Sequence, residues 1–354
     1  MVLDASRLYQ EDVMGNRGVS TQVAQRWRRV AFCLLLAGSV LGAGAGLRPR
    51  AAPSWSPSLV GTAPLTALTV DPGDGMWAYV GDATGRLYRT SDGGRTFHSA
   101  AGGLGGAIRV LAVDPSQPLT VYALTNTGLY KSASGGAHYS KIGSGLPPAR
   151  TVHAIAVITS SVLYAGAATG LLRSDDGGRT FRAQALEKPT APGTAADVWA
   201  IGADTRTPAR LYVLSAAGIN VSNNGGHTWR LDDSTSALVA LTVASRAAGS
   251  TVYVLTAEGR TLSFRGDGLR DTLTQIEPPP GVSVQAIAAG AHGRLYVGTH
   301  GKGVSVSTDQ GLSWKPVDPP PSTLTITALA GRTGSASSPL YVLTAAKLFR
   351  ATDS

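Results

Sequence analysis

The clearest copy of a recurring eight-residue box runs Ser174-Asp175-Asp176-Gly177-Gly178-Arg179-Thr180-Phe181. In such a box an Asp or Asn side chain can fold back onto nearby backbone N–H groups, and a Gly accepts a positive φ angle. The final aromatic residue begins the next strand. We therefore predict that the box is a turn between two β-strands, with its acid and hydroxyl engaged in holding that turn rather than in catalysis.

Four further copies share the pattern S/T-x-D/N-x-G-x-S/T-aromatic to different degrees. They read TSDGGRTF at 90–97, SNNGGHTW at 222–229 and STDQGLSW at 307–314, while SASGGAHY at 132–139 has lost its acid and its Thr. The stretch 263–269 is the most degraded, although its Gly-Asp-Gly can still make a turn. The residues predicted to hold these turns are Asp92, Gly94, Asp176, Gly178, Asn224, Gly226, Asp309 and Gly311.

A column of tyrosines fixes the number of repeats. Each lies in an apolar run such as RLYVLSAAG at 210–218, and successive members are 43, 42, 48, 41, 43 and 45 residues apart. A period of about 40 to 50 residues is typical of propellers and solenoids. The members are Tyr79, Tyr122, Tyr164, Tyr212, Tyr253, Tyr296 and Tyr341, which predicts seven repeats.

Each repeat reads as four short strands, A to D. Strand A is a small apolar run such as Ala67–Val70 or Val110–Val113, strand B carries the tyrosine, strand C precedes the box and strand D follows it. Short strands separated by Gly, Pro, Asn and Asp, with no helical periodicity after residue 50, indicate an all-β fold. Seven four-stranded antiparallel sheets arranged radially make a seven-bladed β-propeller.

The two ends of the repeat region complement each other. Residues 351–354 are only the front half of a box, and 53–57 resemble the back half found at 312–316. We therefore expect residues 54–61 to supply the outer strand of the last blade, which would close the ring and protect its edges. A ring of six blades with a stray half is the alternative.

The residues before the propeller divide into three segments. Residues 1–29 are polar and predicted to be cytoplasmic, 30–47 are apolar, 48–53 form a short linker, and 54–354 form the propeller. Arginines directly before the apolar run orient it with its N-terminus in the cytoplasm. The run is predicted to be an N-terminal hydrophobic helix, either an uncleaved signal-anchor or a signal peptide cut after Ala45, and the long leader favours the anchor. We expect a single-pass cell-membrane protein with an extracytoplasmic propeller, or a secreted or periplasmic one if the leader is cleaved.

Composition excludes several classes of function. The net charge is +9, of which residues 1–50 contribute seven basic and three acidic side chains, so the propeller is only weakly basic and has no Lys/Arg cluster suited to nucleic acid. Cys33 is the only cysteine and lies in the apolar run, so the propeller has no disulfide. The six histidines show no paired metal spacing, and no phosphate-binding Gly loop or nucleophile elbow occurs. We expect no metal, no cofactor and no catalytic residue.

Alternate loops of a four-stranded blade share a face. The D–A and B–C loops are predicted to lie on one face of the ring, where most propellers bind, and the A–B loops and boxes on the other. Aligned A strands place one varied column just ahead of the apolar run: Thr66, Arg109, His153, Trp199, Val239, Gln285 and Thr327. The predicted partner-binding residues on this face are Arg109, His153, Trp199, Gln285, Asp82, Asn126, Glu258, His300 and Lys302.

The box, the period and the sevenfold count resemble Asp-box (BNR-repeat) propellers over residues 53–354. In size and layout the chain is most similar to the photosystem II assembly/stability factor-like family, and more distantly to sortilin-like and sialidase-type propellers. That resemblance implies a non-enzymatic scaffold for protein–protein interaction that serves assembly or stability of a membrane protein complex, with a membrane-associated protein partner. Nothing in the sequence ties it to photosynthesis.

An Asp-box glycoside hydrolase, sialidase-like or xyloglucanase-like, or a glycan-binding lectin is the alternative. The sequence departs from the sialidase pattern because no Arg-Ile-Pro element occurs, and from the xyloglucan enzymes because one propeller is present where they usually join two. A glycosidase needs two carboxylates facing one sugar bond. Asp82, Asp197 and Glu258 could share the binding face, but they come from different blades with nothing to force them together.

Overall fold

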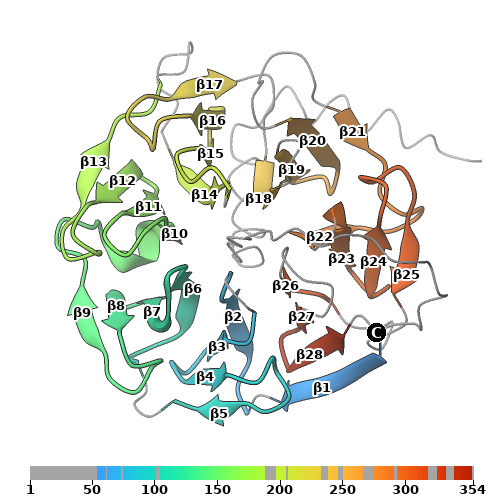
Figure 1. The fold of residues 1–354 in the computed structure, drawn as a ribbon, viewed down its shortest axis with the longest axis horizontal. Coiled ribbons are helices and arrows are strands. Elements are labelled where there is room, and N and C mark those ends of the chain that lie inside the picture. The colour runs from blue at the N-terminus through green and yellow to red at the C-terminus, as the bar shows by residue number, and fades with distance from the viewer. Residues whose placement is uncertain are drawn as a thin grey trace, which may run out of the picture.

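The strands form seven four-stranded antiparallel sheets arranged around a common centre (Figure 1). This computed structural model describes residues 54–60, 62–72, 75–100, 104–187, 197–204, 206–232, 238–245, 250–265, 274–290, 293–317, 325–331 and 339–352. The predicted all-β, seven-bladed propeller is confirmed. The predicted segments 1–29, 30–47 and 48–53 lie outside the described residues, and within the described ranges no helix is long and apolar enough to cross a membrane.

Blades 1 to 4 follow the chain in order, each from an innermost strand A to an outermost strand D. Blade 1 consists of β2 (Leu65–Val70), β3 (Ala78–Asp82), β4 (Leu87–Thr90) and β5 (His98–Ser99). Blade 2 consists of β6 (Ile108–Asp114), β7 (Gln117–Thr125), β8 (Leu129–Ser132) and β9 (Ser140–Ile142). Blade 3 consists of β10 (Val152–Val157), β11 (Leu163–Ala167), β12 (Gly170–Ser174) and β13 (Arg182–Gln184). Blade 4 consists of β14 (Val198–Ala203), β15 (Leu211–Ser215), β16 (Gly218–Ser222) and β17 (Arg230–Asp232).

Blades 5 and 6 repeat this order. Blade 5 consists of β18 (Leu238–Ala244), β19 (Thr251–Thr256), β20 (Thr261–Arg265) and β21 (Thr274–Ile276). Blade 6 consists of β22 (Val284–Ala289), β23 (Leu295–Thr299), β24 (Val304–Ser307) and β25 (Lys315–Val317). A single turn of 3-10 helix, η1 (Ala149–Thr151), lies in the connection between blades 2 and 3, where the sequence predicted none.

The seventh blade combines both ends of the propeller sequence. It consists of β26 (Ala328–Gly331), β27 (Leu340–Leu343) and β28 (Lys347–Thr352), with β1 (Ser54–Val60) as its outer strand. In the antiparallel β1–β28 pair, Ser54 lies opposite Thr352 and Val60 opposite Lys347, and the two strands lie side by side in Figure 1. This confirms the predicted closure and rules out the ring of six blades with a stray half.

The A strands form the inner wall of the ring, because each contacts the A strand of the next blade and β26 contacts β2. Between blades the facing surfaces are apolar. One buried cluster, for example, joins Val110 and Leu124 of blade 2 to Ile155 and Leu163 of blade 3. Burying one such side chain stabilises the fold by roughly 1.5–3 kcal/mol, so the blades are held mainly by this packing.

The tyrosine of strand B also links each of several blades to the box of the next. The Tyr164 hydroxyl donates to the Gly225 carbonyl oxygen at 2.7 Å, and Arg173 of β12 donates to the same oxygen at 2.9 Å. Tyr122 and Lys131 share the Gly177 carbonyl oxygen in the same way, each at 3.3 Å. One box carbonyl thus receives both a phenol and a cation from the preceding blade, which gives a physical reason for the tyrosine column and the box to recur together.

In blade 1 this link is shifted by a few residues. Arg89 donates to the carbonyl oxygens of Ser134 and Gly135 at 3.1 and 3.0 Å, while the Tyr79 hydroxyl donates to the Pro118 carbonyl oxygen at 2.7 Å. Burial raises the pKa of Tyr79 to about 12, so its hydroxyl remains a donor at neutral pH. The worn box of blade 2 therefore still joins two blades.

In the box of blade 3 the acid and the hydroxyl close the turn. Ser174 Oγ donates to Asp176 Oδ1 at 2.8 Å and accepts from the Gly178 N–H at 2.9 Å. Asp176 in turn accepts from the Thr180 N–H at 2.9 Å and from its hydroxyl at 2.6 Å. Ser134 takes the place of the acid in the worn box and accepts one bond, from the His138 N–H at 3.1 Å.

A stabilising substitution follows from the box of blade 6. Gln310 has a φ of 67° and is the only non-glycine residue with a positive φ within the described ranges, whereas the other boxes have glycine there. Holding a non-glycine residue in the left-handed region costs the folded state about 1–2 kcal/mol. Glycine removes this cost, but its greater freedom in the unfolded chain offsets about 0.4–1 kcal/mol of the gain. Gln310→Gly is expected to raise the free energy of unfolding by about 0.5–1 kcal/mol in urea titrations. Gln310→Ala, which keeps a Cβ, should change it little, and a loss of stability in the glycine variant would contradict the prediction.

Three box aspartates make stability depend on pH in the acid range. Hydrogen bonds from Thr180 lower the pKa of Asp176 to about 2, and those from Ser313 lower the pKa of Asp309 to about 2. Burial would raise the pKa of Asp92, but its hydrogen bonds to the turn outweigh that effect and lower it. Because the folded state favours the carboxylate, this stabilisation is complete above the unfolded pKa of about 4 and is lost as the pH falls through the folded values. The urea midpoint should therefore fall between about pH 4 and about pH 2, by a modest amount because the three carboxylates lie near the surface and are screened by solvent.

The control is the triple variant Asp92→Asn, Asp176→Asn and Asp309→Asn. Asn224 already holds the box of blade 4, where its Oδ1 accepts from the Thr228 N–H at 2.9 Å, so an amide fits the turn and does not titrate. The variant should show a flatter pH profile than the parent. Equal slopes in the two proteins would assign the acid sensitivity to other groups.

Candidate functional site

Backbone hydrogen bonds between loops define the two faces of the ring. On one face the B–C loops bond to the D–A connections, as where the Ala83 N–H donates to the Pro64 carbonyl oxygen at 2.8 Å. On the other face the boxes bond to the A–B loops, as where the Gly93 N–H donates to the Met76 carbonyl oxygen at 3.0 Å. The predicted pairing of loops is confirmed. We call the face of D–A and B–C loops the docking face, and the face of A–B loops and boxes the box face.

The varied column of strand A coincides with a β-bulge. In blade 4, Val198 pairs with Ser215 and Ala200 with Leu214, which leaves Trp199 as the extra residue. The same shift occurs in six blades, and its extra residues are Thr66, Arg109, His153, Trp199, Val239 and Gln285. A bulge bends the strand and re-aims a side chain. The fold therefore places the least repetitive side chain of each of these blades at the docking-face end of the inner wall.

Two of the bulge side chains reach into the next blade. Thr66 Oγ1 donates to the Ile108 carbonyl oxygen at 2.6 Å. The half-buried Arg109 guanidinium donates to the carbonyl oxygens of Ala149 and Val152 at 2.8 and 2.9 Å, and burial lowers the pKa of Arg109. These side chains hold neighbouring blades together as well as bordering the mouth of the ring.

His153 and Asp197 approach each other across the next pair of blades. His153 Nε2 lies 3.2 Å from Asp197 Oδ1, and the two residues are only 7% and 9% exposed. Asp197 immediately precedes β14, so the pair joins blades 3 and 4. Sequence reasoning placed Asp197 on this face, and the structure adds His153 as its neighbour.

Trp199 and Gln285 contribute to the wall of the mouth. Trp199 is half-buried and packs against an apolar cluster that includes Leu238 and Leu241 of blade 5. Its indole Nε1 is buried and has no hydrogen-bond acceptor among the described residues. Gln285 is 8% exposed, and its Nε2 donates to Ser283 Oγ at 3.1 Å. Both side chains shape the surface more than they project from it.

Asp82 holds the B–C loop of blade 1. It is completely buried, and its Oδ1 accepts from the N–H groups of Thr84 and Arg86 at 2.8 and 2.9 Å and from the Thr84 hydroxyl at 2.7 Å. Burial would raise the pKa of Asp82, but these hydrogen bonds and a longer one from Tyr88 outweigh it and lower the pKa. The carboxylate is therefore a turn-holding group of the docking face rather than an exposed contact.

Five other blades carry a buried hydroxyl at the position of Asp82. Thr299 Oγ1, for example, donates to the Gly303 carbonyl oxygen at 2.8 Å and so closes the B–C loop of blade 6. The group consists of Thr125, Ser215, Thr256, Thr299 and Thr344. Sequence reasoning missed this set. The available signal was a Ser, Thr or Asp three residues before a recurring Gly, as at Thr125 and Gly128.

The remaining predicted residues are exposed on B–C loops. They are Asn126 of blade 2, Glu258 of blade 5, and His300 and Lys302 of blade 6. Their side chains make no hydrogen bond to other parts of the chain that the structure describes. The structure thus brings all nine predicted residues to one face, with five engaged in or against the ring and four available to a partner.

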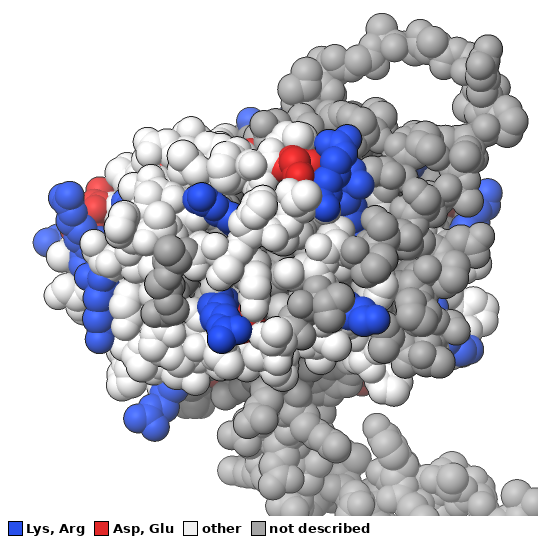
Figure 2. All heavy atoms as spheres, turned by 90° about the horizontal axis from the view of Figure 1, so that it is seen from below, with Lys and Arg blue, Asp and Glu red and all other residues white. Residues whose placement is uncertain are grey.

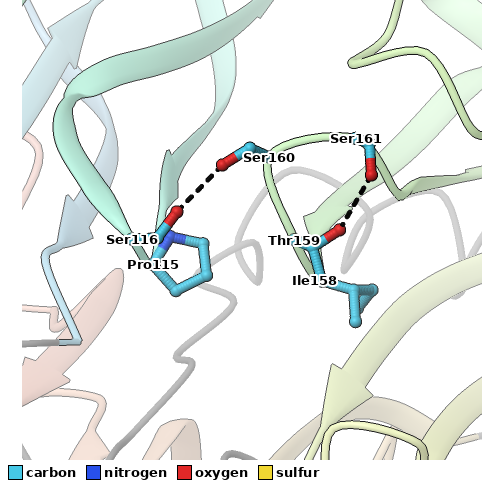
Figure 3. A pocket seen from close by; sticks show the side chains of 6 residues that line it. All are labelled: Pro115, Ser116, Ile158, Thr159, Ser160 and Ser161. Carbon is cyan, nitrogen blue, oxygen red and sulfur yellow. Dashed lines mark hydrogen bonds between the residues drawn. The ribbon is translucent and has the colours of Figure 1, made fainter.

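A pocket of about 470 Å³ lies on the box face, between the A–B loops of blades 2 and 3 (Figure 3). It is lined by Pro115, Ser116, Ile158, Thr159, Ser160 and Ser161. The hydroxyl oxygens of Ser116 and Ser160 lie 2.9 Å apart across it. The lining holds hydroxyl groups and no charged side chain, so it offers neither a general acid nor a general base, and none of the predicted residues belongs to it.

The charged side chains of the described residues are dispersed or held in local contacts. Figure 2 shows one side of the ring, on which Lys and Arg side chains are scattered among uncharged ones. No three His, Cys, Asp or Glu side chains among the described residues are grouped so as to hold a metal. On the docking face Asp82 is held within its loop, Asp197 lies beside His153, and Glu187 accepts a bond from the Leu231 N–H.

No protein-family model matches the sequence, and no curated protein matches it. Among solved structures, YCF48 from Cyanidioschyzon merolae superposes with a TM-score of 0.64 at 15% identity, covering 85% of this chain and 98% of that chain. A structure of YCF48 bound to D1 peptide gives 0.63 at 14% identity, covering 87% and 97%. A GH74 xyloglucanase from Xanthomonas campestris gives 0.62 at 18% identity and covers 84% of this chain, which spans only 53% of that chain. At these identities the likeness shows a shared propeller fold.

Proposed function

We propose that the chain is a non-enzymatic propeller scaffold that binds a segment of a protein partner on its docking face. The observation that carries this proposal is the bulge repeated in six blades, which places non-repeating side chains at one mouth of the ring. Beside that mouth the exposed Asn126, Glu258, His300 and Lys302 supply an amide, an acid and basic groups suited to a polypeptide.

The partner is proposed to be membrane-associated, because the apolar run 30–47 would hold the chain in the membrane with the propeller on the extracytoplasmic side. The peptide-bound YCF48 structure shows that another ring of this fold can bind a peptide, which supports a protein partner here. Service in the assembly or stability of a membrane protein complex is the finer form of the proposal.

A glycoside hydrolase is disfavoured by the chemistry of the acids. A general acid needs a carboxyl group whose pKa is raised, and a glycosidase needs a second carboxylate facing it. The pKa values of Asp82, Asp92, Asp176 and Asp309 are all lowered, because each carboxylate accepts hydrogen bonds from its own turn. These groups are suited to holding loops and not to protonating a leaving group.

The exposed loop of blade 6 gives the cleanest test. Arg109→Ala would remove the hydrogen bonds to the carbonyl oxygens of Ala149 and Val152, which tie blade 2 to the start of blade 3, and would confuse binding with stability. The variant of choice is therefore His300→Ala with Lys302→Glu. Purification of the tagged full-length protein from its own membranes in mild detergent should yield a stoichiometric protein partner. The double variant should capture that partner at least about tenfold less well, since a few central contacts carry most of the binding energy.

The matched control reverses one charge elsewhere. Arg182 is exposed on the outer strand β13, so Arg182→Glu should leave capture unchanged. Equal capture by the docking-face variant and the control would remove the docking face from the proposal. Release of sugar from xyloglucan or sialylated oligosaccharides by the purified chain would instead favour the hydrolase.

A further inference from the structure

The box face has an unusual distribution of apolar side chains. Three large apolar side chains among the described residues are exposed: Met76 at 36%, Leu119 at 42% and Leu312 at 88%. Met76 lies in the A–B loop of blade 1 and Leu119 near the start of β7, just after the A–B turn of blade 2. Each has its backbone carbonyl bonded to a box, while Leu312 lies inside the box of blade 6. All three therefore belong to the box face.

The charges of the boxes complete this pattern. The sixth position of the box carries Arg95, Arg179, His227 and Leu312 in blades 1, 3, 4 and 6, and all four side chains are exposed. The box acids Asp92, Asp176 and Asp309 are instead turned onto backbone N–H groups of their own turns. The further box acid Asp175 is exposed and pairs with Arg173, whose guanidinium lies 2.8 Å from its carboxylate. The sixth positions of the boxes thus add basic and apolar side chains to a face whose box acids already have partners, a combination that suits an anionic lipid surface.

The register of β1 fixes where the chain enters the ring. The B–C loop of blade 7 precedes Lys347, so β28 runs from the docking face at Lys347 toward the box face at Thr352. Because β1 is antiparallel to β28 and Ser54 lies opposite Thr352, Ser54 lies at the box edge of the blade. In the other blades this is the place where strand D leaves the box.

The length of chain before Ser54 limits how far the ring can lie from the apolar run. Only the six residues 48–53 separate Leu47 from Ser54. A fully extended chain spans about 3.3–3.6 Å per residue, so the seven steps from Leu47 to Ser54 reach about 25 Å at most. A ring tethered so closely by its box edge has little freedom to present the opposite face to the bilayer.

We propose that the box face lies against the membrane surface, with the exposed tips of the boxes contacting anionic phospholipid, so that the docking face points away from the bilayer. This inference rests on the proposed membrane anchor at 30–47. It adds an orientation of the ring to the proposed function, because the partner segment would then bind from the aqueous side. Two features would set this orientation: the point where the chain enters the ring and the side chains at the box tips.

The test uses single cysteines in the full chain reconstituted into vesicles of phosphatidylcholine and phosphatidylglycerol. Cys33→Ala removes the native thiol, and an environment-sensitive fluorophore is then placed at Leu312→Cys or His227→Cys on the box face, or at Asn126→Cys or Glu258→Cys on the docking face. A lipid carrying a headgroup quencher should at least halve the emission from the two box-face labels and leave the two docking-face labels nearly unchanged.

Flotation of the same vesicles separates failure of the anchor from failure of the orientation. A chain that does not float with lipid overturns the tether and the inference together. A chain that floats while its docking-face labels are quenched, or while no label is quenched, overturns the orientation alone. Partner capture is measured in detergent without this bilayer, so the proposed binding function stands or falls independently.

Discussion

Gly226→Ala is expected to lower the free energy of unfolding by about 2–5 kcal/mol. The φ of Gly226 is +83°, where a side chain costs about 1–2 kcal/mol, and a Cβ there would lie 2.0 Å from the Tyr164 hydroxyl oxygen. Relief of that clash would move the tyrosine and break its buried bond to the Gly225 carbonyl oxygen, a further loss of about 1–3 kcal/mol. Urea unfolding followed by circular dichroism measures the total.

Gly225→Ala is the matched control, because it adds the same methyl group one residue earlier. The φ of Gly225 is +69°, yet a Cβ there would meet nothing within 4 Å. It should cost only about 1–2 kcal/mol, the price of the left-handed backbone. Adding Tyr164→Phe should restore part of the stability of Gly226→Ala, because it removes the clashing oxygen, whereas in the Gly225→Ala background it should only destabilise. Equal losses in the two alanine variants would contradict a lock between the tyrosine and the box.

This contact between the tyrosine of one blade and the box of the next shows what the sequence could and could not predict. The period of the tyrosines and the spacing of the box residues specify seven blades because each is a local, repeated constraint: a buried aromatic residue and a turn. The role of Arg173 was not visible, because its contact with Gly225 joins residues 52 apart across two blades. From the sequence alone, a basic residue in strand C would be expected to be exposed. Its contact with the next blade becomes visible only in the structure.

The candidate site was predictable in outline for a similar reason. Alignment of the A strands located the varied column, because a position that differs from repeat to repeat can be recognised in the sequence alone. The bulge that re-aims this column was not predicted, because it depends on pairing with strand B. His153 and Asp197 likewise meet only when blades 3 and 4 are adjacent. A Ser, Thr or Asp three residues before a recurring Gly was the available signal for the buried position of Asp82, but the hydrogen bonds that bury it could be seen only in the structure.

Asp82→Ala is expected to destabilise the ring by about 2–4 kcal/mol. The substitution removes the carboxylate that accepts from the N–H groups of Thr84 and Arg86. A hydrogen bond to a charged group contributes about 1.5–3 kcal/mol, and water recovers part of this loss because Thr84 and Arg86 are themselves exposed. Glu258→Ala is the control from the equivalent loop of blade 5, where the exposed carboxylate should contribute less than about 0.5 kcal/mol. Thermal and urea unfolding of both variants would measure the difference.

Asp82→Thr separates a role in holding the B–C loop from a role in direct contact with the partner. Thr125, Thr256, Thr299 and Thr344 hold the corresponding loops of other blades through their hydroxyl groups, so threonine should recover much of the stability lost in the alanine variant. If the carboxylate serves the docking face only by shaping its loop, Asp82→Thr should also capture the partner as the parent does. A variant that is stable but fails in capture would show that the partner reads the carboxylate itself, and the loop would have to open for that contact to form.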